Sequence, residues 1–236
     1  MRKMCSGVSS QCCMYSAWKP GAGVTAMPGT ESPFEQHAQA YDRWFEINRA
    51  VYESEIKAVG HCIPEDGKGL EVGVGTGRFA EPFGITAGIE PSTAMADIAD
   101  ERGINIVKGT GEHIPFRDSV FDFVLVVTTI CFFDNVPVAL RECFRVIKEG
   151  GCIVVGFVDR NTPLGKTYAA RQQENEFYRH ASFYSAEEIM DLLEQAGFSG
   201  FDAVQTVFGS LENITGEQNF RSGYGEGGFA VIKGNK

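Results

Sequence analysis

The segment from Gly69 to Glu90 constrains the fold most, because it places a glycine-rich turn between two short apolar runs. Apolar side chains alternate through residues 70–74, as in a β-strand. Glycines at three alternate positions then let the backbone approach a ligand where a side chain would intrude; they are Gly73, Gly75 and Gly77. Such a turn opens onto a helix N-terminus, and Glu90 ends the next strand, where a carboxylate can accept hydrogen bonds from a ribose diol. The segment therefore predicts a strand–turn–helix–strand unit that binds a nucleoside.

The spacing of the glycines distinguishes between two kinds of nucleoside. A dinucleotide-binding turn has the pattern Gly-x-Gly-x-x-Gly, but here the third glycine comes one residue early and Arg78 occupies its place. Glu71 also lies two residues before the first glycine, where a carboxylate would repel a pyrophosphate. A ligand with a cationic group near the turn fits these residues better. A nicotinamide-dependent oxidoreductase is therefore the less favoured alternative.

Three segments resemble one enzyme family. The pattern hydrophobic-Glu-x-Gly-x-Gly-x-Gly, with an acid seventeen residues after its first glycine, resembles the class I S-adenosylmethionine (SAM)-dependent methyltransferases. Residues 109–116 and 139–151 resemble segments of the methyltransferase type 11 group, which includes small-molecule enzymes like those of ubiquinone and menaquinone biosynthesis. Thr110 stands where that group usually has an aspartate that contacts the adenine amino group. The resemblance covers residues 32 to about 159.

The resemblance implies an α/β fold with a Rossmann-like doubly wound seven-stranded sheet, mostly parallel with an antiparallel C-terminal edge strand. The near-continuous apolar run in residues 118–129 agrees with this fold, because it is typical of a strand buried on both faces. Residues 31–236 are expected to form a single SAM-binding methyltransferase domain after a disordered N-terminal extension, residues 1–30. The polar residues 160–182 follow the fifth predicted strand and are a candidate lid insertion over the cofactor cleft.

The resemblance also implies SAM as the cofactor and indicates which residues contact it. Tyr41 corresponds to a tyrosine that commonly covers the methionine end of the cofactor in this family. Glu71 is expected to help hold the methionine ammonium, and Glu90 to bind the ribose hydroxyls in charge-assisted hydrogen bonds. The predicted cofactor site consists of Tyr41, Glu71, Gly73, Gly75, Gly77, Glu90, Pro91, Ser92, Met95, Gly111, Glu112 and Thr128.

The acceptor of the methyl group is expected to be a small organic molecule. No Asn/Asp-Pro-Pro-Tyr/Phe motif follows the fourth predicted strand, so the nucleic-acid and protein methyltransferases that use this motif are disfavoured. A mixed apolar and polar set is expected to line the mouth of the site: Trp44, Ile130, Phe132, Asp159, Arg160 and Tyr184. Asp159 is a candidate general base and Arg160 a candidate contact for an acidic substrate, although each also fits as a helix cap or surface charge. No catalytic residue is assigned, because a sulfonium methyl is already activated and positioning the acceptor contributes much of the catalysis.

Charge and composition argue against several other classes of protein. The formal net charge of −10 and a pI near 4.9 disfavour a nucleic-acid partner, which needs a basic face. No apolar run reaches the roughly 18 residues of a membrane helix, so a cytoplasmic protein without a membrane partner is expected. No metal site is predicted, because no Cys-x-x-Cys pair occurs. A non-catalytic SAM-binding module stays open as an alternative, and the sequence does not predict the oligomeric state.

Overall fold

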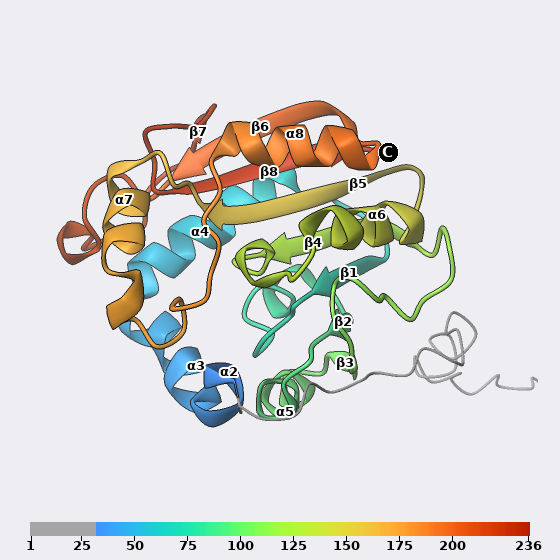
Figure 1. Ribbon diagram of the computed structural model, residues 1–236, viewed down its shortest axis with the longest axis horizontal. Coiled ribbons are helices and arrows are strands. Elements are labelled where there is room, and N and C mark those ends of the chain that lie inside the picture. Colours follow the sequence, from blue (N-terminus) through green and yellow to red (C-terminus); the bar gives the residue numbers. More distant parts are fainter. Residues whose placement is uncertain (1–31) are drawn as a thin grey trace, which may run out of the picture.

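The computed structural model describes residues 32–236, which form a mixed eight-stranded sheet with helices on both faces (Figure 1). The strands lie in the order β3-β2-β1-β4-β5-β8-β6-β7. β1 to β5 pair in parallel, and β8 pairs antiparallel with both β5 and β6. The strands are β1 (Gly69–Val72), β2 (Ala87–Ile89), β3 (Asn105–Val107), β4 (Phe121–Val127), β5 (Ile147–Val158), β6 (Ser199–Thr206), β7 (Arg221–Ser222) and β8 (Phe229–Asn235). The predicted disordered extension, residues 1–30, lies outside the described residues.

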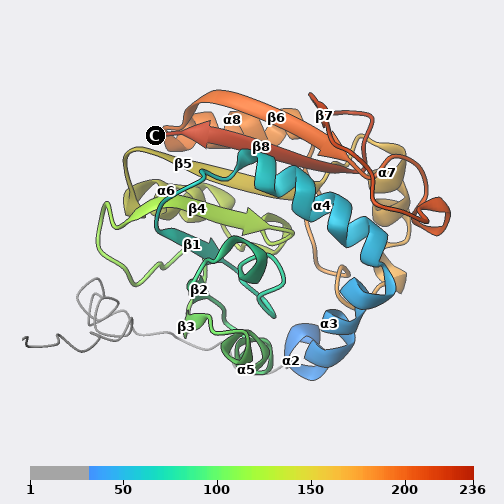
Figure 2. The ribbon, with the colours of Figure 1, turned by 180° about the vertical axis from the view of Figure 1, so that it is seen from behind.

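Helices cover the two faces of the sheet. The α-helices of the described chain are α2 (Pro33–Gln36), α3 (Ala38–Ile47), α4 (Arg49–Cys62), α5 (Thr93–Glu101), α6 (Val136–Val146), α7 (Pro163–Ala170) and α8 (Ala186–Ala196). Short 3-10 helices are η1 (Glu81–Phe83), η2 (Ile130–Phe132), η3 (Gln172–Glu174) and η4 (Leu211–Asn213). α6 and α8 lie on one face of the sheet (Figure 1), while α4 lies on the opposite face against β5, β6 and β8 (Figure 2). None of these helices is long and apolar enough to cross a membrane.

The two layers of the core meet at the central strand β4. Val124 and Val126 point into the cluster with α6 and α8, whereas Phe123, Leu125 and Val127 point into the cluster with α4. All five side chains are at most 3% exposed. The strand is therefore buried on both faces, as its continuous apolar sequence predicts.

The predicted doubly wound mixed sheet is confirmed, with two differences at its C-terminal side. The two-residue strand β7 adds an eighth strand and forms the edge. The C-terminal strand β8 is antiparallel as predicted, but it lies between β5 and β6, because it pairs with β5 from Cys152↔Asn235 to Val158↔Phe229 and with β6 on its other side.

The N-terminal helical region consists of three successive helices. The chain breaks at His37 and Asn48, so that α2, α3 and α4 follow one another. Ser32 caps α2, since its hydroxyl accepts a hydrogen bond from the Glu35 amide at 3.3 Å. β5 begins at Ile147, because a register shift in its pairing with β4 lets residues 148–151 join the strand.

Candidate active site

A cavity of about 140 Å³ lies at the carboxyl ends of β1, β2 and β4, where open α/β sheets bind their ligands. We refer to it as the central cavity. Nine of the twelve predicted cofactor residues line it: Tyr41, Gly73, Gly75, Glu90, Pro91, Met95, Gly111, Glu112 and Thr128. Phe34, Gly109, Thr110, Thr129, Phe132, Phe133 and Asp134 complete the lining. Segments that are far apart in the sequence therefore meet around one site.

In the glycine turn, Gly73 and Gly77 have no room for a side chain, whereas Gly75 faces open space. All three glycines have positive φ, at +69° for Gly73, +54° for Gly75 and +84° for Gly77. A Cβ on Gly73 would lie 2.1 Å from the side chain of Thr129, and one on Gly77 would lie 2.4 Å from Ile104. A Cβ on Gly75 would meet only the Tyr41 ring, at 3.8 Å. Gly77 thus serves the packing of the turn, whereas Gly75 borders the central cavity.

The Glu90 carboxylate is fixed at the edge of the central cavity. One of its oxygens accepts a hydrogen bond from the Gly75 amide at 2.9 Å, and the other from the Ser92 amide at 2.9 Å. The residue is 6% exposed, and burial raises the pKa of its carboxyl to about 7. Each oxygen retains a lone pair for another donor, so the geometry suits a diol that offers two hydroxyls.

The Glu71 carboxylate lies behind the glycine turn, outside the lining of the central cavity. It is 1% exposed, and its Oε2 has no hydrogen-bond partner within residues 32–236. Burial raises the pKa of this carboxyl well above its usual range, although the backbone of Ala80 donates a hydrogen bond to it, and the charge of Glu90 raises it further. Two neighbouring carboxyls without a compensating cation favour a positively charged ligand.

Tyr41 and Thr128 meet at the end of β4. The two side chains are hydrogen-bonded, and burial raises the pKa of the Tyr41 phenol. Thr128 has φ +50°, a left-handed conformation that costs free energy for a residue other than glycine and is found preferentially at functional sites. The Tyr41 ring thereby forms one wall of the central cavity.

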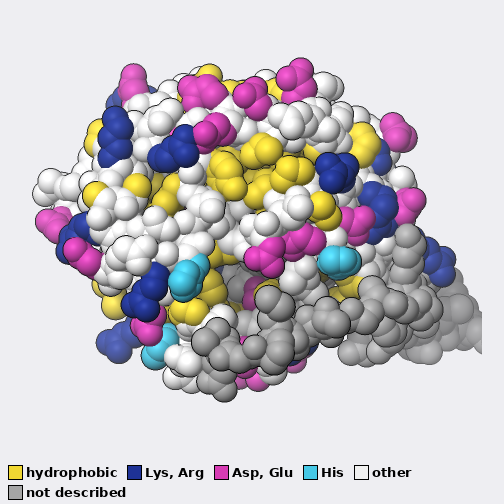
Figure 3. Space-filling view, viewed as in Figure 1, with side chains coloured by type: hydrophobic (Ala, Val, Ile, Leu, Met, Phe, Trp, Pro, Cys, Tyr) yellow, Lys and Arg dark blue, Asp and Glu magenta, His cyan; other side chains and the backbone are white. Residues whose placement is uncertain are grey.

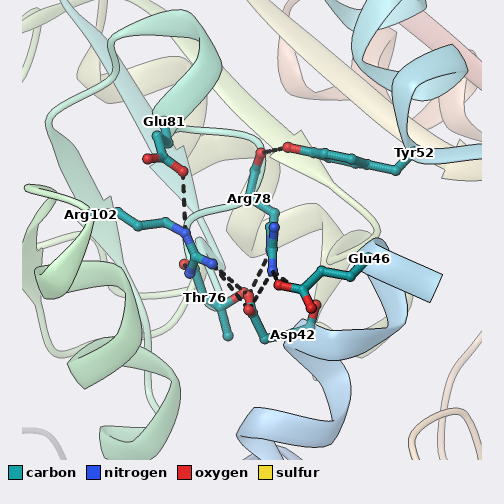
Figure 4. A network of polar contacts seen from close by, with 7 residues as sticks. All are labelled: Asp42, Glu46, Tyr52, Thr76, Arg78, Glu81 and Arg102. Atoms are coloured by element: carbon teal, nitrogen blue, oxygen red, sulfur yellow. Dashed lines mark hydrogen bonds and ion pairs between the residues drawn. The ribbon is translucent and has the colours of Figure 1, made fainter. Parts of the chain in front are cut away.

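A polar network that the sequence does not reveal holds α3 against the glycine turn (Figure 4). The Asp42 carboxylate accepts hydrogen bonds from Arg78, at 2.8 and 2.5 Å, and from Arg102, at 3.0 Å. Arg102 also donates to the Thr76 carbonyl, and the Tyr52 hydroxyl donates to the Arg78 carbonyl, both at 2.5 Å. In the sequence, Arg78 was the residue that could have indicated this network, since it stands where a dinucleotide-binding turn has glycine. Asp42 follows Tyr41 directly, so the network also positions Tyr41.

Ser92, which was predicted as a cofactor contact, is engaged within the protein. Its hydroxyl donates to the Glu35 carboxylate at 2.6 Å and accepts from the Met95 amide at 3.3 Å. The same Glu35 oxygen accepts from the Thr93 amide at 2.8 Å, so α2 is attached to the N-terminus of α5. These hydrogen bonds, with the Lys108 charge, outweigh the slight burial of Glu35 and lower the pKa of its carboxyl.

The residues predicted around the acceptor separate into two groups. Phe132 lines the central cavity, and Ile130 and Tyr184 line a small adjacent cavity that shares Thr128 with it. Trp44 instead packs edge-to-face on a core ring, Phe45, with 5.2 Å between the centroids. The structure thus brings only part of the predicted set toward the cofactor side.

The two charged residues of that set have local partners. The Asp159 carboxylate is 1% exposed and accepts a hydrogen bond from the Asn161 amide at 2.9 Å, while its Oδ2 has no partner in the described part of the chain. Arg160 donates to the Phe183 carbonyl at 3.1 Å and to Glu188 at 2.6 Å. Neither side chain lines the central cavity, and Arg160 matches the alternative expectation of a surface charge.

Aromatic side chains of residues 160–182 contact three residues that line the central cavity. The Phe177 ring lies 5.4 Å from that of Phe34 and 5.7 Å from that of Tyr41. Tyr178 stacks on Phe132 at 5.7 Å. The cavity, at about 140 Å³, is smaller than a typical ligand site of about 300–1,000 Å³.

Comparisons with known proteins agree with this geometry. Residues 70–155 match the family model described as a methyltransferase domain. A crystal structure from Thermotoga maritima, described as a SAM-dependent methyltransferase and possible histamine N-methyltransferase, is 47% identical with a TM-score of 0.84, covering 86% of this chain and 97% of that one. An uncharacterised Methanocaldococcus jannaschii protein is 43% identical over 203 residues, covering 86% of this chain and 98% of the relative. A Staphylococcus aureus demethylmenaquinone methyltransferase is 29% identical over 205 residues, covering 70% of this chain and 83% of the relative.

The fold and the glycine-turn site are those of the class I SAM-dependent methyltransferases. The chain belongs to the SAM-dependent methyltransferase family, and its cofactor is SAM. The residues present fit this cofactor, because the unpartnered oxygen of Glu71 and the negative surroundings suit a ligand with a sulfonium and an ammonium group. The alternative of a nicotinamide-dependent oxidoreductase is thereby set aside.

Proposed function

We propose that this methyltransferase transfers the methyl group of SAM to a small organic acceptor within a site that residues 160–182 cover as a lid. The observation that carries the proposal is the convergence of nine predicted cofactor residues on the central cavity, with Glu90 fixed by the Gly75 and Ser92 amides. Bound SAM supplies a methyl group on a cationic sulfur. The residues 31–236 act as a single domain in this proposal.

The side chains of the central cavity bind and orient in this proposal. Glu90 accepts hydrogen bonds from the ribose hydroxyls, and Gly75 leaves room for the cofactor beside the turn. Tyr41 covers the methionine end, while the buried charge of Glu71 favours its ammonium group. Met95 packs against adenine. The reaction then depends on holding the acceptor in line with the methyl group, which is an orientation effect.

The character of the surface supports a small acceptor over a nucleic acid. On the face drawn in Figure 3, Lys and Arg side chains are interspersed with Asp and Glu and form no continuous basic field. The net charge of −10 acts in the same direction. The Thermotoga relative is described as a possible histamine N-methyltransferase, and the Staphylococcus relative as a demethylmenaquinone methyltransferase. Both of these acceptors are small organic molecules.

The test is the affinity for SAM of a Glu90→Ala variant, measured by isothermal titration calorimetry. We expect the Kd to rise at least tenfold, because two charge-assisted hydrogen bonds of about 1.5–3 kcal/mol each are lost. The control is Glu194→Gln, which changes an exposed carboxylate on α8. Wild-type affinity in Glu90→Ala would contradict the proposed role of Glu90, and a wild-type protein that does not bind SAM would contradict the proposed function.

A further inference from the structure

A second cavity, larger than the central cavity, lies between α7 and the η4 loop. Its volume is about 540 Å³, within the range of about 300–1,000 Å³ that is typical of ligand pockets. Residues 163–178 contribute one wall, and residues 209–212 contribute the other. We call it the outer cavity. The residues of the described chain that line it include none of the predicted cofactor residues, so a bound cofactor leaves this space for a second molecule.

The outer cavity lies at the same edge of the sheet as the central cavity (Figure 1). β6 runs parallel to β5, because both strands pair antiparallel with β8. α7 follows the carboxyl end of β5, and the η4 loop follows the carboxyl end of β6. Both walls therefore extend from the carboxyl edge of the sheet, where β1, β2 and β4 also open onto the central cavity.

Shared residues connect the outer cavity to the central cavity. Tyr178 lines both the outer cavity and the small adjacent cavity. Thr128 lines both the adjacent cavity and the central cavity. The Tyr178 ring also stacks on Phe132, a residue of the central cavity, with 5.7 Å between the centroids. The three cavities therefore follow one another, with Tyr178 between the outer and the central cavity.

The two walls of the outer cavity are anchored to the rest of the domain. On α7, the Leu164 side chain packs so closely on Gly228 that a Cβ there would lie 2.4 Å from it. On the η4 loop, the Gln218 side chain bonds the Phe208 amide at 2.6 Å and the Phe208 carbonyl at 3.1 Å. The Ser54 hydroxyl of α4 accepts a hydrogen bond from the Gln218 amide at 2.8 Å. The cavity is thus preformed, which lowers the cost of ordering it around a ligand.

Backbone strain occurs at both ends of this series of cavities. The described residues other than glycine that have positive φ are Ser119 at +56°, Thr128 at +50° and Val207 at +63°. Thr128 lines the central cavity, and Val207 ends β6 two residues before Gly209 of the outer cavity. This conformation is least favourable for a β-branched residue and is concentrated at functional sites. The strain at Val207 therefore agrees with a ligand site at the outer cavity.

The inner lining of the outer cavity is aromatic and apolar. Tyr168 contacts Tyr178 edge-to-face, with 5.5 Å between the ring centroids. Leu164 and Leu211 face the cavity from the two opposite walls. Aromatic rings favour a further ring in an offset or edge-to-face arrangement, and apolar side chains favour the burial of its carbon atoms.

The charged residues of the outer cavity are exposed and do not form a buried ion site. Arg171 and Glu174 pair with each other at 3.0 Å, and their side chains are 70% and 68% exposed. Glu212 is also exposed. In the adjacent cavity, the lining that the structure describes contains no Asp, Glu, Lys, Arg or His side chain. An ammonium or carboxylate group that entered would lose its water without gaining a buried counter-ion.

We propose that the outer cavity binds the methyl acceptor, and that the part of the acceptor held there is an uncharged aromatic group. The proposal rests on the proposed function and adds no chemical step to it. The aromatic group packs on Tyr168 and Tyr178. The atom that receives the methyl group extends past Tyr178 toward Thr128 and the central cavity.

The first test measures the binding of three naphthalene compounds to the full-length enzyme saturated with S-adenosylhomocysteine. At pH 7, 2-naphthol is uncharged, 2-naphthoate is an anion and 2-naphthylmethylamine is a cation. In isothermal titration calorimetry, we expect the Kd of 2-naphthol to be at least about tenfold below that of either ion, because the ions find no buried counter-ion. Equal or tighter binding of one of the ions, or no binding of 2-naphthol, would overturn the inference.

Tryptophan substitutions locate the bound compound. Thr167→Trp fills the outer cavity from α7, and Ser210→Trp fills it from the opposite wall. Each should raise the Kd of 2-naphthol at least about tenfold and leave the affinity for SAM unchanged, which shows that the variant is folded. The matched control is Lys166→Trp, at an exposed position of the same helix that does not line the outer cavity; it should keep both affinities. Unchanged 2-naphthol binding in both cavity variants would overturn the inference.

The second test follows methyl transfer from SAM to a panel of uncharged aromatic alcohols and thiols that includes 2-naphthol. We expect methylated product from at least one compound, with a raised KM for that acceptor in Thr167→Trp and an unchanged KM for SAM. Product from none of the panel, or an unchanged acceptor KM in both cavity variants, would overturn the inference. Failure of the wild type to bind SAM would overturn the proposed function instead.

Discussion

Two buried carboxyls, those of Glu71 and Glu90, give this site its negative character. Burial is the largest cause that raises the pKa of each, and no Lys or Arg side chain is hydrogen-bonded to either of them in the described chain. Such groups destabilise the ligand-free fold when they ionise. A cationic ligand reverses that effect, because it brings the missing positive charge to the site. The cost in stability and the selectivity for a cation therefore have the same origin.

Glu55, a buried residue of α4, is predicted to make folding pH-dependent. Its folded-state pKa of about 8 lies above the ordinary value of 4.5, so between these values the folded protein holds a proton that the unfolded chain has released. The free energy of unfolding therefore falls as pH rises, by up to about 1.4 kcal/mol per pH unit for this group. Glu55→Gln removes this dependence. In urea unfolding without SAM, we expect the variant to gain stability relative to wild type between pH 5 and pH 8.

Comparison within the same helix separates this effect from general electrostatics. Glu90 and Glu71 titrate in both the wild type and the Glu55→Gln variant. Their contributions to the free energy of unfolding therefore cancel when the two proteins are compared at each pH. Glu53→Gln changes the same residue type at a partly exposed position and should show a difference from wild type that does not vary with pH. A constant difference between Glu55→Gln and wild type from pH 5 to pH 8 would mean that Glu55 is already ionised in the folded protein.

At the scale of elements, the position of α3 decides the shape of the central cavity. Its helical pattern is evident in the sequence, but its attachment is not, because Asp42 and Arg78 lie 36 residues apart and each looks like an ordinary surface charge. In the structure their side chains are 15% and 17% exposed, and Arg102 completes the pair at 16%. The ion pairs therefore tie α3 to the glycine turn and to α5 (Figure 4).

We predict that Asp42→Asn loosens α3. The substitution leaves two half-buried guanidinium groups without their shared anion, at a cost of about 2–3 kcal/mol, somewhat below the roughly 3–5 of a fully buried pair. The Tm should fall by several degrees, and amide hydrogen exchange should accelerate in residues 38–47. The Kd for SAM should also rise, because Tyr41 loses its support. The exposed pair Arg49–Glu53 provides the control, since Glu53→Gln should change stability by less than about 0.5 kcal/mol.

At the scale of the whole molecule, the sequence predicts the positions of those site residues that lie within a single strand–turn–helix unit. Glu71, the glycines and Glu90 lie in one such unit, so their spacing alone places them at one end of the sheet. The acceptor side depends on segments that are far apart in the chain, such as Phe34 against Phe177. Sequence periodicity does not reveal these contacts. For the same reason, the sequence does not show that Trp44, a predicted acceptor residue, packs against Phe45 of the core.

At the same scale, we expect the molecule to open when it binds its cofactor. The central cavity of about 140 Å³ is lined by Phe34 of α2, whose ring contacts Phe177 of residues 160–182. Separation of these two rings would widen the entrance. Entry of SAM is therefore expected to displace residues 160–182, and a bound nucleoside is expected to stabilise the closed arrangement.

Limited trypsin digestion provides the measurement for this motion. Arg171 and Arg179 are exposed cleavage sites within residues 160–182. S-adenosylhomocysteine at ten times its Kd should slow cleavage at both sites about tenfold, because it reduces the open population by that factor. Phe177→Ala should weaken this protection, since the closed arrangement loses its contacts with Phe34 and Tyr41. Cleavage at Arg221, an exposed residue of β7, should stay unchanged; equal protection there would indicate that the ligand stabilises the whole domain and does not act through a lid.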